Sequence, residues 1–144
     1  MRTALYLILT FVVTLPIVTQ HQRTDPDEIE TVVQESYIEG VFVNRNEEVV
    51  RSGFHPSFVM AVYVNDEIIQ ASLDMWMERL QLDGSPSGDD VEAIFHSIDV
   101  TNNAATVKLE VWINQMHTYT DYLSLYKFQD EWKIVNKIFA SHSD

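Results

Sequence analysis

Asp121 and His55 are the two residues whose types and positions best suit acid–base chemistry. In the run from 119 to 125, period-two alternation places Asp121 on the same strand face as the apolar Leu123 and Leu125. A carboxylate on an apolar face is poorly hydrated, and such groups serve as general bases or ligand acceptors. The alternative is a structural aspartate near a strand end, hydrogen-bonded to backbone or to a lysine across the sheet.

His55 precedes Pro56, and proline disfavours helical backbone in the residue before it, so His55 is expected in a loop near the mouth of a cone-like fold. A histidine near the open end of a pocket could transfer protons close to neutral pH. It could equally anchor the segment through one hydrogen bond. The anchor is favoured, because no partner acid can be assigned to His55.

Three aromatic residues and one lysine are candidates for ligand binding. Tyr37, Trp76 and Tyr119 could form the stacking walls of a pocket for a flat heterocycle, although aromatic rings at such spacings are more often simple core. Lys137 alternates with Val135 and Phe139, and if that face is inward the lysine can face a buried acid. The opposite register instead turns Trp132, Ile134 and Ile138 inward, and the sequence leaves both registers open.

Metal, cofactor and nucleic-acid chemistry find little support in the composition. The chain has no cysteine, and its five histidines lack metal-ligand spacing, so neither a metal nor a cofactor is expected. His96 shares a predicted strand face with Ile94 and Ile98, which indicates a core histidine. The net charge of −13 is spread along the chain and repels phosphate backbones, which argues against a nucleic-acid partner.

The first twenty residues have the character of a signal peptide. One arginine precedes an almost uninterrupted apolar run over residues 4–18, which is short for a membrane span. We therefore expect export to the periplasm or the extracellular space. The alternative is an uncleaved anchor formed by residues 4–18, and only then is the membrane a partner. The rest, residues 25–142, is expected to form one domain.

Helical and period-two patterns order this domain. Asp25, with Glu28 in a capping box, is the expected N-cap of a first helix, and Gly40 in that helix suggests close packing against another element. A second helix is expected after Asn44 and a third after Ser72. Strands are predicted at residues 58–64, 67–71, 94–100, 105–113, 117–128 and 132–140. Consecutive antiparallel strands with segregated helices indicate an α+β fold, in which a cone-like curved antiparallel sheet carries the N-terminal helices on its concave face.

This order resembles the nuclear transport factor 2-like cone fold, shared by ketosteroid isomerase, scytalone dehydratase and the SnoaL polyketide cyclases, and is closest to the putative lumazine-binding proteins. The segments that carry the resemblance are 37–40, 54–56, 72–76, 119–125 and 132–137. The group's name implies lumazine binding. In ketosteroid isomerase-like relatives a pocket acid is catalytic, which draws attention to Asp121, but a shared fold does not imply shared chemistry.

Three functions follow as expectations. The first is a binding module whose cone cavity takes a small apolar or aromatic molecule without turnover. The second is an isomerase, cyclase or dehydratase that uses Asp121 and His55 as acid–base residues. The third is an interaction protein that forms a homodimer through its exposed sheet face, with the cavity packed shut. Homodimerisation is expected in the first two cases as well.

Overall fold

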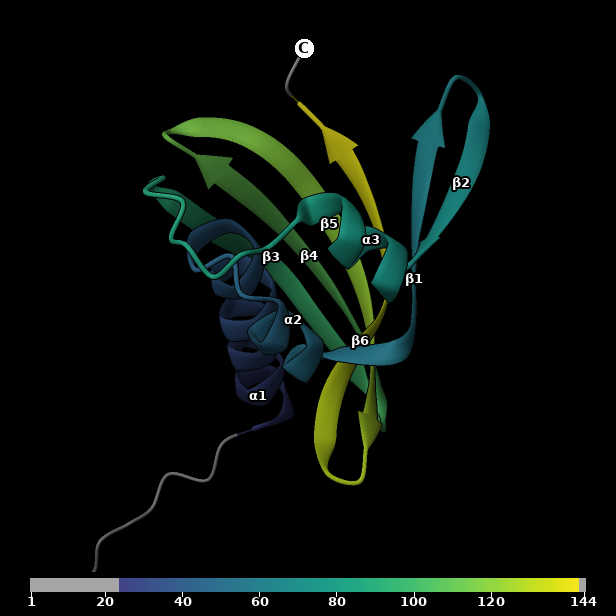
Figure 1. Cartoon of the computed structure of the whole chain (residues 1–144). Coiled ribbons are helices and arrows are strands. Elements are labelled where there is room, and N and C mark those ends of the chain that lie inside the picture. Colours follow the sequence, from purple (N-terminus) through teal and green to yellow (C-terminus); the bar gives the residue numbers. More distant parts are fainter. Residues whose placement is uncertain (1–23, 143–144) are drawn as a thin grey trace, which may run out of the picture.

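A six-stranded sheet curves around the helices in the computed structural model, which describes residues 24–142 (Figure 1). The helical segments are α1 (Asp25–Val32), η1 (Val33–Val43), α2 (Glu47–Gly53) and α3 (Leu73–Leu80). The strands are β1 (Phe54–Val64), β2 (Glu67–Ser72), β3 (Val91–Thr101), β4 (Ala104–Ile113), β5 (Met116–Phe128) and β6 (Glu131–Ser141). The predicted α+β fold, with helices on the concave face of a curved sheet, is confirmed.

The strand order β2-β1-β6-β5-β4-β3 brings the first hairpin beside the last strand. Neighbouring strands are antiparallel except for β1 and β6, which run parallel, so the sheet is mixed and not wholly antiparallel as predicted. This one parallel pair joins the hairpin to the meander, and it places β1, α3 and the inner face of β6 around the same space (Figure 1). Antiparallel pairing of consecutive strands accounts for the rest of the sheet.

The first helix begins one residue earlier than the sequence predicted. Thr24 is the N-cap, and its backbone nitrogen donates to Asp27 Oδ2 at 3.0 Å. The predicted box of Asp25 and Glu28 is wrong because the Asp25 carboxylate accepts hydrogen bonds elsewhere, from Lys127 Nζ at 2.7 Å and Trp132 Nε1 at 3.2 Å. Tertiary partners about a hundred residues away have thus overridden a local capping signal.

From Val33 onward the helix widens to π geometry, which closes hydrogen bonds between residues five apart. One such bond runs from the Asn44 nitrogen to the Glu39 oxygen at 2.7 Å. The predicted second helix after Asn44 is present as α2, but Asn44 itself has helical backbone at the end of η1. Asn46 caps α2 instead, its side chain accepting from the nitrogens of Glu48 and Val49. The close packing expected at Gly40 is present, since a Cβ there would lie 3.0 Å from Val50.

Of the register shifts in the sheet, those in β3 and β6 decide which way His96 and Lys137 face. In β3 the register shifts between Phe95 and Ser97, which turns His96 to the outer face. The prediction that His96 is a core histidine is therefore wrong: it is exposed and lies 2.9 Å from Glu110. In β6 the extra residue is Val135. Before it the even-numbered residues of β6 face inward, and after it the odd-numbered residues do, so the strand adopts both of the registers that the sequence left open.

The core lies between the inner sheet face and the helices. Trp132 and Ile134 are buried before the β6 bulge, and Lys137 is buried after it. The predicted export segment, residues 1–20, and the alternative anchor, residues 4–18, lie outside the described residues. Among residues 24–142, none of the helices has the length and apolar character needed to cross a bilayer.

Candidate functional site

A cavity of about 380 Å³ lies between η1, α3, β1 and the inner faces of β5 and β6. The structure brings all four predicted ligand-binding residues into its wall: Tyr37, Trp76, Tyr119 and Lys137. Its volume is within the range of small-molecule sites. The cone is therefore not packed shut, which conflicts with the third of the expected functions. A ligand-binding role for the four residues stays a prediction.

Beneath this cavity, Tyr37, Lys137 and Asp121 form a buried polar cluster. Tyr37 Oη donates to Asp121 Oδ2 at 2.5 Å, and Lys137 Nζ donates to Tyr37 Oη. Lys137 Nζ also lies 2.9 Å from Asp121 Oδ1. Within residues 24–142, Oδ1 receives no hydrogen bond of acceptable geometry. The close approach of Lys137 to this oxygen is therefore mainly electrostatic.

Burial shifts the proton equilibria of two members of this cluster. It raises the pKa of Tyr37 well above its ordinary value, and the nearby Asp121 charge adds to the effect, so the phenol keeps its proton. Burial lowers the pKa of Lys137, and the attraction of Asp121 opposes that shift. The lysine is only 4% exposed and the aspartate is fully buried. Lys137 thus loses its proton more readily than a surface lysine does.

Aromatic rings surround the Lys137 ammonium group. Nζ lies 4.4 Å from the ring centroid of Tyr37, 5.0 Å from that of Phe139, and within 6 Å of those of Trp76 and Tyr119. Such rings attract a cation through their electron-rich faces. They also supply flat walls on which an aromatic ligand can stack beside the amine.

The charges around the cavity differ in sign from those of the whole protein. The chain carries a formal net charge of −13, yet the charged residues that line the cavity, Lys137 and Arg79, are both cationic. Arg79 is exposed on α3, and Lys137 is buried on β6. Asp121 lies behind Lys137 and Tyr37 rather than in the wall. A ligand with an electron-rich oxygen is the partner that this arrangement favours.

His55 lies on β1 rather than in the expected loop and is apart from Asp121, so the structure does not assemble the expected acid–base pair. The neighbouring Phe54 is paired with Ile134, whereas Asp121 is opposite Phe139, five residues further along β6. At about 3.3 Å per residue, this separation is roughly 16 Å. His55 Nδ1 instead accepts from the Ser57 nitrogen at 3.2 Å, and its ring stacks on Phe128. These are the contacts of a structural anchor.

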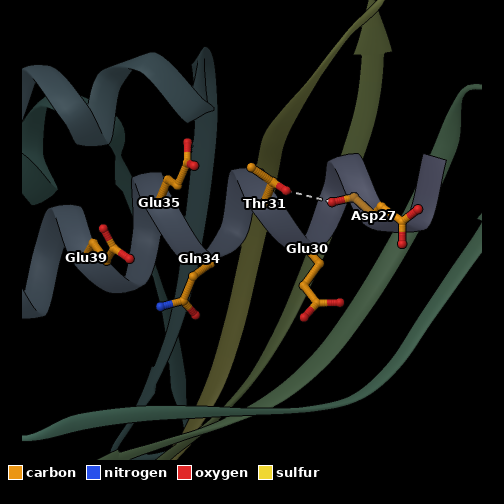
Figure 2. A pocket seen from close by; sticks show the side chains of 6 residues that line it. All are labelled: Asp27, Glu30, Thr31, Gln34, Glu35 and Glu39. Carbon is orange, nitrogen blue, oxygen red and sulfur yellow. Dashed lines mark hydrogen bonds between the residues drawn. The ribbon is translucent and has the colours of Figure 1, made fainter. Parts of the chain in front are cut away.

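A second hollow, of about 400 Å³, lies along the first helix and is strongly acidic (Figure 2). Its carboxylates leave the helix in different directions rather than converging on one point (Figure 2). Within residues 24–142, no group of three or more His, Asp or Glu side chains could hold a metal ion. This hollow is a solvated helix face.

Four of the eleven residues that line the cavity were assigned to a site from the sequence, and Phe42 on η1 and Arg79 on α3 are an aromatic and a charged residue that were not. Phe42 is five residues after Tyr37, a spacing that puts them on different faces of an α-helix. In the wider η1 segment their ring centroids are 5.4 Å apart. Arg79 is exposed near the end of α3 and carried no signal beyond its charge.

Known proteins resemble this chain in sequence and in fold. The sequence profile of the family described as putative lumazine-binding matches residues 24–140. A curated relative, aldolase FrzH of Cladobotryum sp., is 38% identical over 93 residues, which cover 64% of this chain and 73% of the relative.

The solved structures show the same fold. A nuclear transport factor 2-like protein of unknown function from Shewanella baltica aligns with a TM-score of 0.70 at 20% identity, over 85% of this chain and all of that one. A similar protein of unknown function from Methylobacillus flagellatus aligns with a TM-score of 0.67 at 23% identity, over 83% of this chain and 93% of the other.

Proposed function

The chain belongs to the putative lumazine-binding family of nuclear transport factor 2-like domains, and we propose that it binds a small apolar or aromatic molecule in the cavity beside Lys137. The observation that carries this proposal is the buried amine of Lys137, surrounded by aromatic rings in the wall of a cavity of about 380 Å³. Aromatic walls with few convergent polar groups are typical of small-molecule sites.

The polar groups indicate how the ligand is oriented. Lys137 supplies the N–H donor at the floor of the cavity, because the Tyr37 hydroxyl proton is already donated to Asp121 behind it. The ligand therefore presents a carbonyl or another acceptor oxygen to Lys137 and stacks its flat body between the rings. Lumazine, after which the family is described, is a flat heterocycle with ring carbonyls and suits this arrangement.

The test is a thermal unfolding series with lumazine as the probe. A ligand that binds only the folded state raises the melting temperature, and a concentration of 100 times the dissociation constant stabilises by about 2.7 kcal/mol. We expect saturable stabilisation that a bulky substitution at the cavity mouth removes. The absence of stabilisation by lumazine and by a panel of flat aromatic carbonyl compounds would contradict the proposal.

An enzymatic function is the second candidate, and one observation gives it weight. Aldolase FrzH is a relative named for catalysis of carbon–carbon bond chemistry. In this chain the groups that approach the cavity are Lys137 and Tyr37, with Asp121 behind them, and His55 is remote. If the chain is an enzyme, we propose that this buried cluster replaces the pairing of Asp121 with His55.

We also propose that the chain forms a homodimer through the outer face of its sheet. Tyr122 and Ile138 are cross-strand partners on that face and are 44% and 49% exposed. Tyr126 on the same strand and Ile94 on β3 are exposed as well. Burial of these apolar side chains against a second copy would remove them from water.

A further inference from the structure

We infer that Lys137 is a nucleophile that condenses with an aldehyde or ketone held in the cone cavity and forms an imine with it. This inference rests on the proposed binding function and names the chemical class of the ligand. It depends on three features of the structure: an amine that reaches the cavity, an acid–base pair that contacts that amine, and walls made of aromatic rings.

The amine reaches the cavity from the inner face of β6. The bulge at Val135 turns Lys137 inward after Ile134, and the side chain lines the cavity while only 4% of the residue is exposed. A lysine held in an apolar pocket is a recurring solution for Schiff-base chemistry, because burial favours the neutral, nucleophilic amine. The lowered pKa of Lys137 agrees with this geometry.

Asp121 and Tyr37 are placed to move the protons that the condensation requires. Lys137 first gives one proton to the Tyr37 oxygen, to which it donates, while the Tyr37 proton passes to Asp121 Oδ2 along their hydrogen bond. The nitrogen lone pair then attacks the carbonyl carbon, and a proton passes from nitrogen to the former carbonyl oxygen, giving a carbinolamine. This step joins the ligand to the chain through one new C–N bond.

Loss of water completes the reaction. Tyr37 donates its proton to the carbinolamine hydroxyl, the C–O bond breaks with its electron pair on oxygen, and nitrogen forms the C=N bond. Asp121 returns its proton to Tyr37 along their hydrogen bond of 2.5 Å. The balance is one ammonium and one carbonyl giving one protonated imine and one water, with no oxidant or reductant. The Asp121 carboxylate is left as the counter-ion of the imine.

The walls restrict which carbonyl compounds fit. The rings of Tyr37, Trp76, Tyr119 and Phe139 all lie within 6 Å of Nζ, so the body of the ligand is apolar and preferably flat. Such a ligand displaces water from the amine, which protects the imine from hydrolysis. Sugars and other polyhydroxylated carbonyl compounds find few polar partners here.

The experiment is reductive trapping on the full chain with 2-naphthaldehyde and sodium cyanoborohydride, followed by peptide mapping with mass spectrometry. Cyanoborohydride converts an imine into a stable amine and leaves the free aldehyde largely unreduced. We expect Lys137 to be labelled at least tenfold faster than Lys108, an outer-face lysine beside Tyr122. 2-Naphthalenemethanol, which has the same shape without the carbonyl, should slow labelling of Lys137 and leave labelling of Lys108 unchanged.

Variants and a binding measurement complete the test. Lys137→Arg keeps a cation beside Asp121 but cannot form an imine, and its adduct should be lost, whereas the matched Lys108→Arg keeps the adduct at Lys137. The protection experiment on the unmodified chain decides the matter even if Lys137→Arg fails to fold. If 2-naphthalenemethanol raises the melting temperature but Lys137 is labelled no faster than Lys108, the imine is refuted and the binding function stands. If the alcohol neither stabilises the fold nor protects Lys137, both proposals fail.

Discussion

Lys137 and Asp121 are diagonal neighbours across β5 and β6, and their charged atoms lie 2.9 Å apart on the inner face of the sheet. Asp121 is directly opposite Phe139, whereas Lys137 is opposite Leu123. A long side chain can bridge such a diagonal. Because Lys137 reaches across it, the ammonium lines the cavity and the carboxylate stays behind it. A ligand in the cavity therefore contacts Lys137, and Asp121 affects the ligand only through its interaction with Lys137.

Replacing Asp121 by asparagine removes the counter-charge of Lys137. Removal of one partner from a buried ion pair costs about 3–5 kcal/mol. We expect Asp121→Asn to lower the free energy of unfolding by about 3 kcal/mol near neutral pH, as measured by urea denaturation. The loss should shrink as the pH rises, since a neutral lysine needs no counter-ion.

The matched control for this substitution is Asp99→Asn. Asp99 is an exposed aspartate on β3, and we expect its replacement to change the free energy of unfolding by less than about 0.5 kcal/mol. Adding Lys137→Met to Asp121→Asn should restore part of the lost stability, because the unpaired charge is then gone. Equal effects of Asp121→Asn and Asp99→Asn would show that the buried pair is not charged in the folded protein.

Tyr37 gives the folded state a distinct response to alkaline pH. Burial and the neighbouring Asp121 raise its pKa above the ordinary value of 10.0, so above that pH the unfolded chain releases this proton while the folded chain keeps it. The unfolded state then binds fewer protons, and the free energy of unfolding falls as the pH rises. Urea denaturation from about pH 9 to 11 should show this fall in the natural chain and a smaller one in Tyr37→Phe.

The lowered pKa of Lys137 changes the free energy of unfolding in the opposite direction, and the comparison of the natural chain with Tyr37→Phe must separate the two effects. Between its folded-state pKa and the ordinary value of 10.5, the unfolded chain binds more protons, so this group adds stability as the pH rises. The contribution of Tyr37 begins near the upper end of that window. Tyr122→Phe, an exposed tyrosine of β5, is the control and should follow the natural chain. A Tyr37→Phe profile parallel to the natural one would contradict the burial of an un-ionised phenol.

Where a strand is regular, the alternation of apolar and polar residues was sufficient to predict which side chains face the core. Between Tyr119 and Leu125 the register of β5 with β4 has no shift, so the period-two pattern placed Asp121 on the inner face correctly. In β6 the same reasoning left two registers open for Lys137. The structure contains both registers, one on each side of the bulge at Val135. One extra residue reverses which side chains face inward, and no residue type in the sequence marks its position.

Other features depended on contacts that a local pattern does not contain. The N-cap moved to Thr24 because Lys127 and Trp132 bind the Asp25 carboxylate. The contact between Tyr37 and Phe42 depends on π geometry, whereas apolar periodicity assumes the α-helical period. The separation of His55 from Asp121 follows from the parallel pairing of β1 with β6. Each of these is a long-range or irregular feature.

Closing the cavity mouth should abolish ligand binding without disturbing the buried cluster. Leu80 lies at the end of α3, half-buried in the cavity wall, and Leu80→Trp adds bulk there. We expect the apparent affinity for lumazine or 2-naphthalenemethanol, measured from the rise in melting temperature, to fall by at least tenfold. Met75→Trp, on the exposed side of the same helix, is the matched control and should bind normally. Normal binding by Leu80→Trp would place the ligand outside the cone.

The outer sheet face should determine the oligomeric state. A lysine in place of Ile138 puts a charge beside Tyr122 at the centre of the proposed interface, and burying an unpaired charge is strongly unfavourable. We expect light scattering after gel filtration to show a dimer for the natural chain and a monomer for Ile138→Lys. Ile68→Lys on β2 provides the control, because Ile68 is exposed on the hairpin at the other edge of the sheet. If Ile68→Lys dissociates the dimer and Ile138→Lys does not, the hairpin is the interface. A monomeric natural chain would refute dimerisation altogether, and ligand binding, which uses the inner face, would be unaffected by that result.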